Sequence, residues 1–360
     1  MHGERGICRP SQERLQERSS PMYELKFDPL LCEQCESIDC VMKCQYIDMT
    51  LEKARDERLK LARGEHSTIL EECVTCYACE EYCPYNNHPF YQIVELQEKL
   101  GVHPTPKPIE ESQVRMMAPR GRIESEELTE PLIDLCFFPM LRGSIRGRLF
   151  EGASVIQGSD VFCNLMFLHF ARNSVIKERL PLIIDNIMSY YLTRNNIEEL
   201  ICFHDECYGT YTKWAPAFGI EVPFKPVHLF EYFRRRLTEL RSEIKPLDIS
   251  IAYQRNCSTR LIPEIEDVLN DVFDLIGARR VKRRYDYENA LCCGGPMEAQ
   301  QRFDLAEENQ NKNVNDMKEA GVTHCVFNCP FCFFTLMEKV SKAGIMPIMI
   351  SDLCHQALGE

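Results

Sequence analysis

The feature that most constrains this chain is the spacing of eight cysteines near its N-terminus. The second of two runs reads Cys73-x2-Cys76-x2-Cys79-x3-Cys83, and Pro84 follows it. This spacing is typical of cubane 4Fe–4S sites, in which three thiolates hold one cluster and the fourth reaches a neighbouring cluster. The run therefore predicts a segment that folds around metal rather than around an ordinary apolar core.

The first run has the same order with two inserted residues. It reads Cys32-x2-Cys35-x4-Cys40-x3-Cys44, and Gln45 stands where the second run has proline. Two such runs predict two cubane clusters that exchange their fourth ligands. One cluster is predicted at Cys32, Cys35, Cys40 and Cys83, and the other at Cys44, Cys73, Cys76 and Cys79.

Two other uses of cysteine explain these runs less well. Structural zinc takes Cys-x2-Cys pairs and has no use for a four-cysteine run that ends in Cys-Pro. Disulfide frameworks belong to small secreted domains, whereas this chain has 360 residues and a polar, Arg-rich start without the apolar stretch of a signal peptide. The 20 cysteines therefore predict a reducing, cytoplasmic location in which thiols bind metal.

The net charge and the distribution of apolar residues limit the kinds of partner that we expect for this chain. The net charge of −13 argues against nucleic acid as a partner. No apolar run approaches the roughly 18 residues that would cross a bilayer. We therefore expect a chain without a transmembrane segment of its own, which could still dock on a membrane subunit.

The sequence divides into five predicted segments. A good helix former, Leu51–Ala62, lies between the two cysteine runs and indicates the larger, α-helical type of ferredoxin domain. Prolines among charged residues indicate a linker after that domain. The predicted segments are an N-terminal arm (1–24), an α-helical two-cluster ferredoxin domain (25–104), a linker (105–131) and two α/β domains (132–245 and 246–360).

The two C-terminal segments have the pattern of α/β domains. Short apolar runs between helical stretches are typical of buried parallel strands. Strands are predicted at Ile133–Phe138, Leu200–Phe203, Ile249–Tyr253, His324–Asn328 and Ile345–Ile350, with helices over Pro263–Leu275 and Phe303–Ala320. The predicted fold class is a multidomain α+β chain, with a helical ferredoxin domain before two pseudo-repeated α/β domains.

A second group of cysteines lies in the last segment. Five thiols come from three loops: Cys257, the adjacent pair Cys292-Cys293 before Gly294-Gly295, and Cys329-x2-Cys332. Five donors exceed the four that zinc takes, and an adjacent pair suits a wider cluster that binds thiolates at separate irons. The alternative is a zinc knuckle at Cys329 and Cys332, with the other thiols packed as small apolar side chains.

An internal repeat relates the two α/β segments. A shift of about 125 residues places His204 and Cys207 opposite Cys329 and Cys332. The corresponding positions of the first segment carry Cys163, His204, Cys207 and either Cys136 or Met140. These donors lack an adjacent Cys-Cys pair and cannot form a five-thiolate site. They predict either a zinc site at Cys136, Cys163, His204 and Cys207 or a vacant remnant.

These motifs, taken in order, resemble those of heterodisulfide-reductase-like iron–sulfur proteins. In the fused, D-type chains of that family a ferredoxin domain precedes two cysteine-rich domains, named CCG after their Cys-Cys-Gly motif. Iron–sulfur subunits of glycolate oxidase and glycerol-3-phosphate dehydrogenase share this order. The resemblance implies a noncubane 4Fe–4S cluster at Cys257, Cys292, Cys293, Cys329 and Cys332. In the family a pair of such clusters faces a disulfide substrate, and the first segment departs from that pattern.

Two function classes follow from this resemblance. In one, the chain is an electron-transfer subunit that relays electrons between partner subunits, including a flavoprotein, of an oxidoreductase complex. In the other, it is a thiol–disulfide reductase with the C-terminal cluster as its active site; no catalytic residue is assigned. The first is favoured, because the sequence contains no G-x-G-x-x-G dinucleotide motif and its first α/β segment is degenerate.

Two basic runs stand out in this acidic chain, Arg234–Arg236 and Arg279–Arg284. Runs of like charge usually form solvated faces. The alternative is a docking site for an acidic partner or an anionic substrate.

Overall fold

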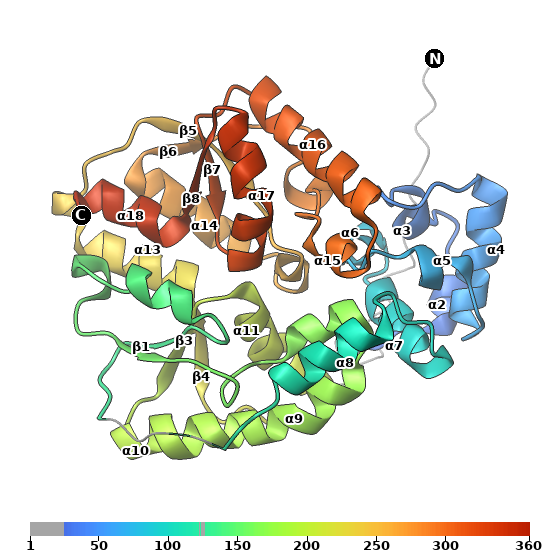
Figure 1. Cartoon of the computed structure of the whole chain (residues 1–360), viewed down its shortest axis with the longest axis horizontal. Helices are drawn as coiled ribbons and strands as arrows, with labels where there is room; N and C mark the ends of the chain where they lie inside the picture. Colours follow the sequence, from blue (N-terminus) through green and yellow to red (C-terminus); the bar gives the residue numbers. More distant parts are fainter. Residues whose placement is uncertain (1–24, 122, 124–126) are drawn as a thin grey trace, which may run out of the picture.

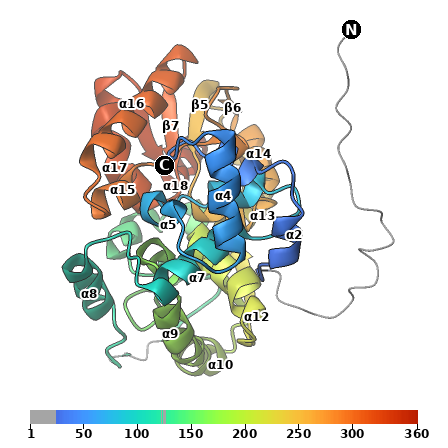
Figure 2. The same ribbon diagram turned by 90° about the vertical axis from the view of Figure 1, so that its right-hand side faces the viewer.

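The computed structural model describes residues 25–121, 123 and 127–360 (Figure 1). The predicted N-terminal arm, residues 1–24, lies outside the described residues. A helical N-terminal part lies beside two stacked α/β parts, and each α/β part has its own sheet. Figure 2 turns the molecule so that the helical part, with α4 across it, faces the viewer.

Residues 25–104, all of which the structure describes, contain helices and no strand. The helices are α2 (Pro29–Glu33), α3 (Asp39–Met42), α4 (Leu51–Ala62), α5 (Thr68–Glu72), α6 (Ala78–Tyr82) and α7 (Pro89–Leu100). The helix predicted between the cysteine runs is confirmed as α4. The Thr50 hydroxyl caps its first turn by accepting a hydrogen bond from the Lys53 N–H, at 3.3 Å.

The segment predicted as a linker contains a helix, α8 (Lys107–Met116). Pro106 and Pro108 lie at the start of this helix, where a missing N–H costs no hydrogen bond. Glu110 on α8 is fully buried and pairs with Arg172 of the first α/β part. The helix is therefore packed onto the domain that follows it.

The first α/β part has a four-stranded parallel sheet. Its strands are β1 (Leu132–Asp134), β2 (Ser154–Ile156), β3 (Glu199–Cys202) and β4 (Lys225–His228), in the order β2-β1-β3-β4. Its helices are α9 (Asn173–Asn186), α10 (Thr193–Asn195), α11 (Asp205–Gly209), α12 (Ala215–Ala217) and α13 (Leu229–Glu239). Two π-helical segments, η4 (Ile187–Leu192) and η5 (Thr210–Trp214), join α9 to α10 and α11 to α12. The 3-10 segments are η1 (Pro139–Ser144), η2 (Arg148–Phe150) and η3 (Leu165–Phe170), followed by η6 (Arg241–Glu243) after α13.

The second α/β part repeats this architecture. Its parallel strands are β5 (Ile249–Gln254), β6 (Ala278–Arg280), β7 (His324–Phe327) and β8 (Met346–Met349), in the order β6-β5-β7-β8. Its helices are α14 (Ile265–Ile276), α15 (Gly295–Ala299), α16 (Phe303–Glu319), α17 (Pro330–Lys342) and α18 (Ile350–Leu358), with 3-10 segments η7 (Ser258–Leu261) and η8 (Tyr287–Asn289). The equivalent strand orders agree with an internal repeat. The prediction of parallel α/β sheets is confirmed.

The strand order determines where functional loops can meet. In each sheet the order reverses beside the central pair, β1 and β3 or β5 and β7. Ligands of open α/β sheets bind outside the carboxyl ends of strands at such a point. The pairing runs to Asp134↔Cys202 in the first sheet and to Gln254↔Phe327 in the second. The loops that carry the predicted donors therefore begin side by side.

The two α/β parts pack closely against each other. Helices α13 and α14 lie in contact between the two sheets (Figure 1). At the start of α11, the buried Asp205 carboxylate accepts hydrogen bonds from the second part, from the Asn328 amide at 2.8 Å and from the Thr259 hydroxyl. The carboxyl ends of the two sheets consequently face each other.

The prediction of a solvated or docking surface is wrong for two arginines of the second basic run. The Arg280 side chain is only 7% exposed and pairs with Glu266 at 3.0 Å and with Asp286. The Arg283 side chain is 1% exposed and pairs with Asp316 at 3.0 Å. Acidic side chains on neighbouring elements pair with these buried guanidinium groups. The sequence of the basic run itself gives no sign of these pairs. In the described part of the chain, no helix has the length and apolarity to cross a membrane.

Candidate metal centres

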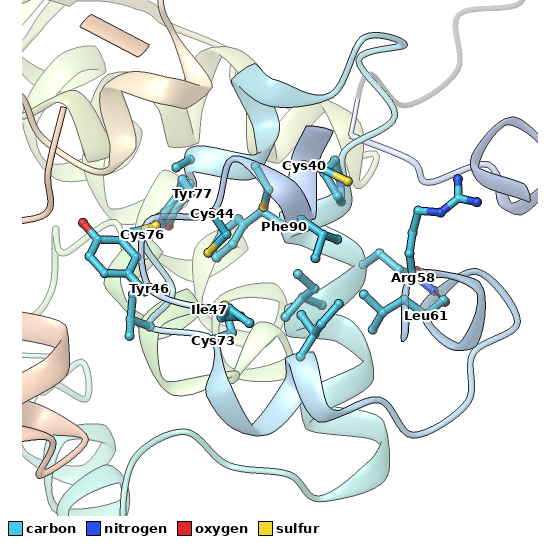
Figure 3. Close-up of a pocket in the computed structure, with 18 of the residues that line it drawn as sticks. Cys40, Cys44, Tyr46, Ile47, Arg58, Leu61, Cys73, Cys76, Tyr77 and Phe90 are labelled. Carbon is cyan, nitrogen blue, oxygen red and sulfur yellow. Dashed lines mark hydrogen bonds between the residues drawn. The ribbon is translucent and has the colours of Figure 1, made fainter. Parts of the chain in front are cut away.

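The helical part surrounds an apolar cavity that is lined by six of the eight cysteines of the two runs (Figure 3). Tyr77 and Phe90 stack at 3.8 Å between ring centroids and form part of its wall. In Figure 3, Cys44 and Cys76 lie on the side of Tyr46, and Cys40 lies toward Arg58. The thiols that line the cavity are Cys32, Cys40, Cys44, Cys73, Cys76 and Cys79.

Cys83 lies with the thiols of the first run. Burial raises the pKa of the Cys40 thiol, and the neighbouring Cys83, Cys32 and Cys35 raise it further. Burial also raises the pKa of Cys32 to about 11, against the opposing charge of Arg58. The structure therefore places Cys83 beside the three cysteines with which the spacing grouped it.

Cys44 lies with the thiols of the second run. Burial raises the pKa of Cys73 to about 12, and the charge of Cys44 contributes to the same rise. The Thr75 N–H donates a hydrogen bond to the Cys73 sulfur at 3.3 Å. Thr75 and Tyr77 have positive φ angles of 55° and 64°, which turn the backbone around Cys76. Soft thiol donors in a buried apolar cavity fit an iron–sulfur cluster.

The five C-terminal thiols form a chain of contacts. The Cys257 and Cys292 sulfurs lie 3.8 Å apart. Cys292 also contacts Cys293, and Cys293 and Cys329 both contact Cys332 through side-chain hydrogen bonds. The structure therefore brings together all five cysteines that the sequence singled out, from the ends of β5 and β7 and the loop before α15.

Two glycines shape the loop that carries the adjacent pair. The N–H groups of Gly294 and Gly295 donate to the sulfurs of Cys292 and Cys293, each at 3.5 Å. Gly294 has a φ of +96°, and an added Cβ would lie 2.8 Å from the Gln310 amide nitrogen. The backbone angle favours glycine there, and a side chain would also require the Gln310 amide to move. This donor set also fits an iron–sulfur cluster.

The first α/β part gathers a smaller donor group. The ligand atoms of Cys136, His204 and Cys207 all lie within 4.8 Å of one another. Cys163 is in contact with two of them, since its sulfur lies 4.0 Å from that of Cys136 and accepts a hydrogen bond from Cys207. Met140, the alternative to Cys136, is 55% exposed. The structure therefore assembles the set with Cys136.

A cavity of about 330 Å³ separates the two α/β donor groups. Its lining includes Cys257, Cys293, Cys329 and Cys332 of the second α/β part and His169, His204 and Glu206 of the first. Burial raises the pKa of Glu206 to about 8 and lowers that of His169 to about 4. His169, to which the sequence gave no role, contacts the Thr75 hydroxyl at 3.0 Å and so connects this cavity to the helical part.

Tyr46 is a contact residue that the sequence did not identify. Its hydroxyl accepts a hydrogen bond from the Cys292 N–H at 2.9 Å, and its ring lines the cavity of the helical part. Burial, with the charges of Cys76 and Cys292, raises the pKa of Tyr46 well above its ordinary value. An aromatic residue two positions after Cys44 carries no motif, so only the tertiary contact shows its place between two donor groups.

Comparison with known proteins finds a family similarity in the second α/β part. Residues 251–337 match the family model of the CCG cysteine-rich domain. A crystal structure of a hypothetical protein from Helicobacter pylori is similar, with a TM-score of 0.52 and 13% identity over 85% of this chain and 64% of that one. This chain thus spans less than two thirds of that protein, and the likeness concerns the fold alone.

A crystal structure of a putative Asp/Glu racemase from Yersinia pestis also matches, with 11% identity. The match covers 63% of this chain and 97% of that one. Its TM-score of 0.31 is too low to support any argument. The CCG match and the clustered cysteines together indicate metal binding, with iron–sulfur chemistry as the best fit to the thiol sets.

Proposed function

We propose that this chain is an iron–sulfur electron-transfer subunit of a heterodisulfide-reductase-like oxidoreductase complex. Cys32, Cys35, Cys40 and Cys83 would hold one cubane cluster, and Cys44, Cys73, Cys76 and Cys79 the other. Cys257, Cys292, Cys293, Cys329 and Cys332 would hold a noncubane cluster. Such clusters supply one-electron transfer at potentials that the surrounding protein adjusts. Cytoplasmic partner subunits, including a flavoprotein, belong to this proposal.

The observation that carries the proposal is the contact at Tyr46. Tyr46 lines the cavity of the helical part together with the thiols of the second group, and its hydroxyl accepts a hydrogen bond from the Cys292 N–H. The three thiol groups therefore follow one another from the helical part to the cavity between the α/β parts. A series of redox sites in this order suits a relay whose last site is the C-terminal one.

Buried ion pairs fix the position of the helical part relative to the second α/β part. Glu81, between Cys79 and Cys83, accepts hydrogen bonds from Arg255 at 2.7 Å and from Arg260. Both arginines belong to the second α/β part and are almost fully buried. A bidentate pairing of this kind fixes orientation as well as distance, so the helical part cannot pivot freely away from Cys292.

The test is the metal content of the full chain purified without oxygen. We expect about twelve irons per chain, four for each of three clusters, with sulfide in equal amount. Replacing Cys332 with Ala should remove about four irons and one EPR signal. Cys354→Ala, at a buried cysteine of α18 outside the three groups, is the matched control. An iron count near eight, unchanged by Cys332→Ala, would contradict the C-terminal site.

The cavity beside the C-terminal thiols favours a second candidate, a thiol–disulfide reductase. It adjoins four of the five cysteines and has both polar and apolar walls. The alternative predicts turnover of a small disulfide by the isolated, metal-loaded chain with an artificial reductant. The relay proposal predicts reduction of the clusters under the same conditions without disulfide turnover.

A further inference from the structure

We propose that Arg58 supplies a buried positive charge to the first cubane cluster and raises the potential at which that cluster accepts an electron. This inference rests on the proposed function, because it concerns the cluster assigned to Cys32, Cys35, Cys40 and Cys83. Arg58 lies on α4, the helix between the two cysteine runs. It belongs to no cysteine motif, so only the tertiary structure places it beside these thiols.

The Arg58 guanidinium lies against the thiols of this group. Its side chain lines the cavity of the helical part together with Cys32 and Cys40 (Figure 3). The Nη1 atom donates a hydrogen bond to the Cys32 carbonyl oxygen, and the guanidinium also hydrogen bonds the Cys32 thiol. Burial raises the pKa of Cys32 and Cys40, and the charge of Arg58 opposes that rise. The charge therefore acts on sulfur atoms that would hold the cluster.

Among the residues that the structure describes, Arg58 has no carboxylate partner. Arg58 is only 5% exposed, and its Nε atom is buried without a hydrogen bond to any of them. The carboxylate of the neighbouring Glu57 is already occupied by Lys60 and by the Thr68 N–H. A buried charge normally requires a group of opposite charge beside it. The position of Arg58 therefore calls for an anionic group in the cavity.

Other buried arginines show how this chain normally meets that requirement. Each of the following pairs with a carboxylate of a neighbouring element: Arg255, Arg260, Arg280 and Arg283. A 4Fe–4S cluster held by four thiolates is anionic, and its net charge helps to set its potential. Such a cluster would be the missing partner of Arg58. Because a nearby cation favours the more negative, reduced state, Arg58 should raise the reduction potential.

The test is an EPR-monitored redox titration of the full, metal-loaded chain. Arg58→Gln removes the charge and keeps an amide that can donate to the Cys32 carbonyl. We expect it to shift the reduction equilibrium of the first cluster toward the oxidised form at least about tenfold, or about 59 mV for a one-electron couple. The signal of this cluster is the one that Cys40→Ser removes.

A matched control removes the same charge elsewhere on α4. Arg55 is exposed on that helix, and Arg55→Gln should shift the equilibrium by less than about threefold, because water and salt screen its charge. An unchanged potential in Arg58→Gln would overturn the inference. So would an equal shift in Arg55→Gln.

A charge-conserving exchange separates the charge from the shape of the side chain. Arg58→Lys should load with iron and keep the equilibrium within about threefold of the wild-type value, since it retains the cation. A shift as large as that of Arg58→Gln would overturn the inference. If Arg58→Gln fails to load, loading of Arg58→Lys supports the inference and its failure overturns it. A wild-type chain without the first cluster would instead contradict the proposed function.

Discussion

At the scale of single residues, the candidate sites are prepared by what surrounds each sulfur. Burial raises the pKa of most of these thiols, so they are protonated until a metal displaces the proton. Backbone N–H groups point at several sulfurs and would stabilise the thiolate after that loss. The donors are Thr75, Asn87, Gly294 and Gly295, and their acceptors are Cys73, Cys83, Cys292 and Cys293.

The exchange of fourth ligands is a prediction at this scale. Because Cys83 lies beside Cys32, Cys35 and Cys40, Cys83→Ser should damage their cluster and spare that of Cys73, Cys76 and Cys79. Cys44→Ser should do the reverse. Each variant should lose up to about four irons and one of two EPR signals. If each variant instead loses the cluster of its own run, the ligand assignment is wrong.

At the scale of elements, helix α6 joins the helical part to the second α/β part. Burial alone would raise the pKa of Glu81, but hydrogen bonds from Arg255 and the charges of Arg260 and Arg255 hold it below its ordinary value. The carboxylate is thus ionised and paired with two buried guanidinium groups. Arg255 has a second partner in Glu266 at 2.8 Å, and Arg260 has carbonyl acceptors at Glu288 and Ala290.

Removing this carboxylate should weaken the junction. We expect Glu81→Ala to lower the free energy of unfolding by about 3 kcal/mol, because it leaves buried positive charge without its partner. Glu95→Ala, at an exposed position of α7, should change it by less than about 0.5 kcal/mol. Denaturant unfolding of both variants at equal iron content measures the difference. Equal changes in the free energy of unfolding of the two variants would show that the Glu81 pairing does not stabilise the junction.

A contact between helices α4 and α5 should make the stability of the protein depend on pH. Glu57 of α4 accepts hydrogen bonds from the Thr68 N–H that begins α5 and from Lys60, both at 2.7 Å. Burial opposes ionisation, but these hydrogen bonds lower the pKa of Glu57 to about 2. The unfolded value is about 4.3, so the contribution to stability is complete above that pH and is lost as pH falls toward 2.

The variant Glu57→Gln isolates this effect. At neutral pH it should be less stable than the wild type by roughly 1.5–3 kcal/mol, the usual range for hydrogen bonds to a charged group. The gap should narrow as pH falls below about 4.3. Glu52→Gln, at an exposed position of the same helix, is the control. A gap that stays constant or widens in acid would contradict the assigned pairing.

At the scale of the whole molecule, the proposed relay carries electrons one at a time, because iron–sulfur clusters are one-electron carriers. The sequence contains no G-x-G-x-x-G motif for a dinucleotide. Exchange between a two-electron donor and one-electron carriers is the task of a flavin. The proposed relay therefore needs a flavin-containing partner at one end.

NADH gives a direct test of this dependence. We expect NADH alone to leave the visible absorbance of the metal-loaded chain unchanged, because NADH donates a hydride whereas iron–sulfur clusters accept single electrons. A chemical one-electron reductant should bleach the same sample and serves as the control. Adding a flavoprotein partner should make NADH effective. Rapid bleaching by NADH without a flavoprotein would refute the relay proposal.

Part of the fold could be predicted because it is encoded locally. The helix α4 and the central strands β1, β3, β5 and β7 follow from periodicity, as does β8. The strands β2, β4 and β6 were not predicted, since each is short, lies at a sheet edge and includes a polar residue such as Ser154, Lys225 or Arg279. Pairing with a central strand stabilises them, and that pairing is not visible in a short window of sequence.

The candidate sites likewise combine features that the sequence predicts with features that depend on tertiary contacts. The short, regular intervals of the two N-terminal runs predicted two thiol sets. The third set was predicted from the resemblance of its five cysteines to the CCG motif. The contact of Tyr46 with Cys292, the cavity between the α/β parts, the choice of Cys136 over Met140 and the burial of Arg280 are long-range facts. They depend on which loops two stacked sheets bring together. The sequence by itself therefore determined the kind of chemistry, and only the tertiary structure decided which groups face one another.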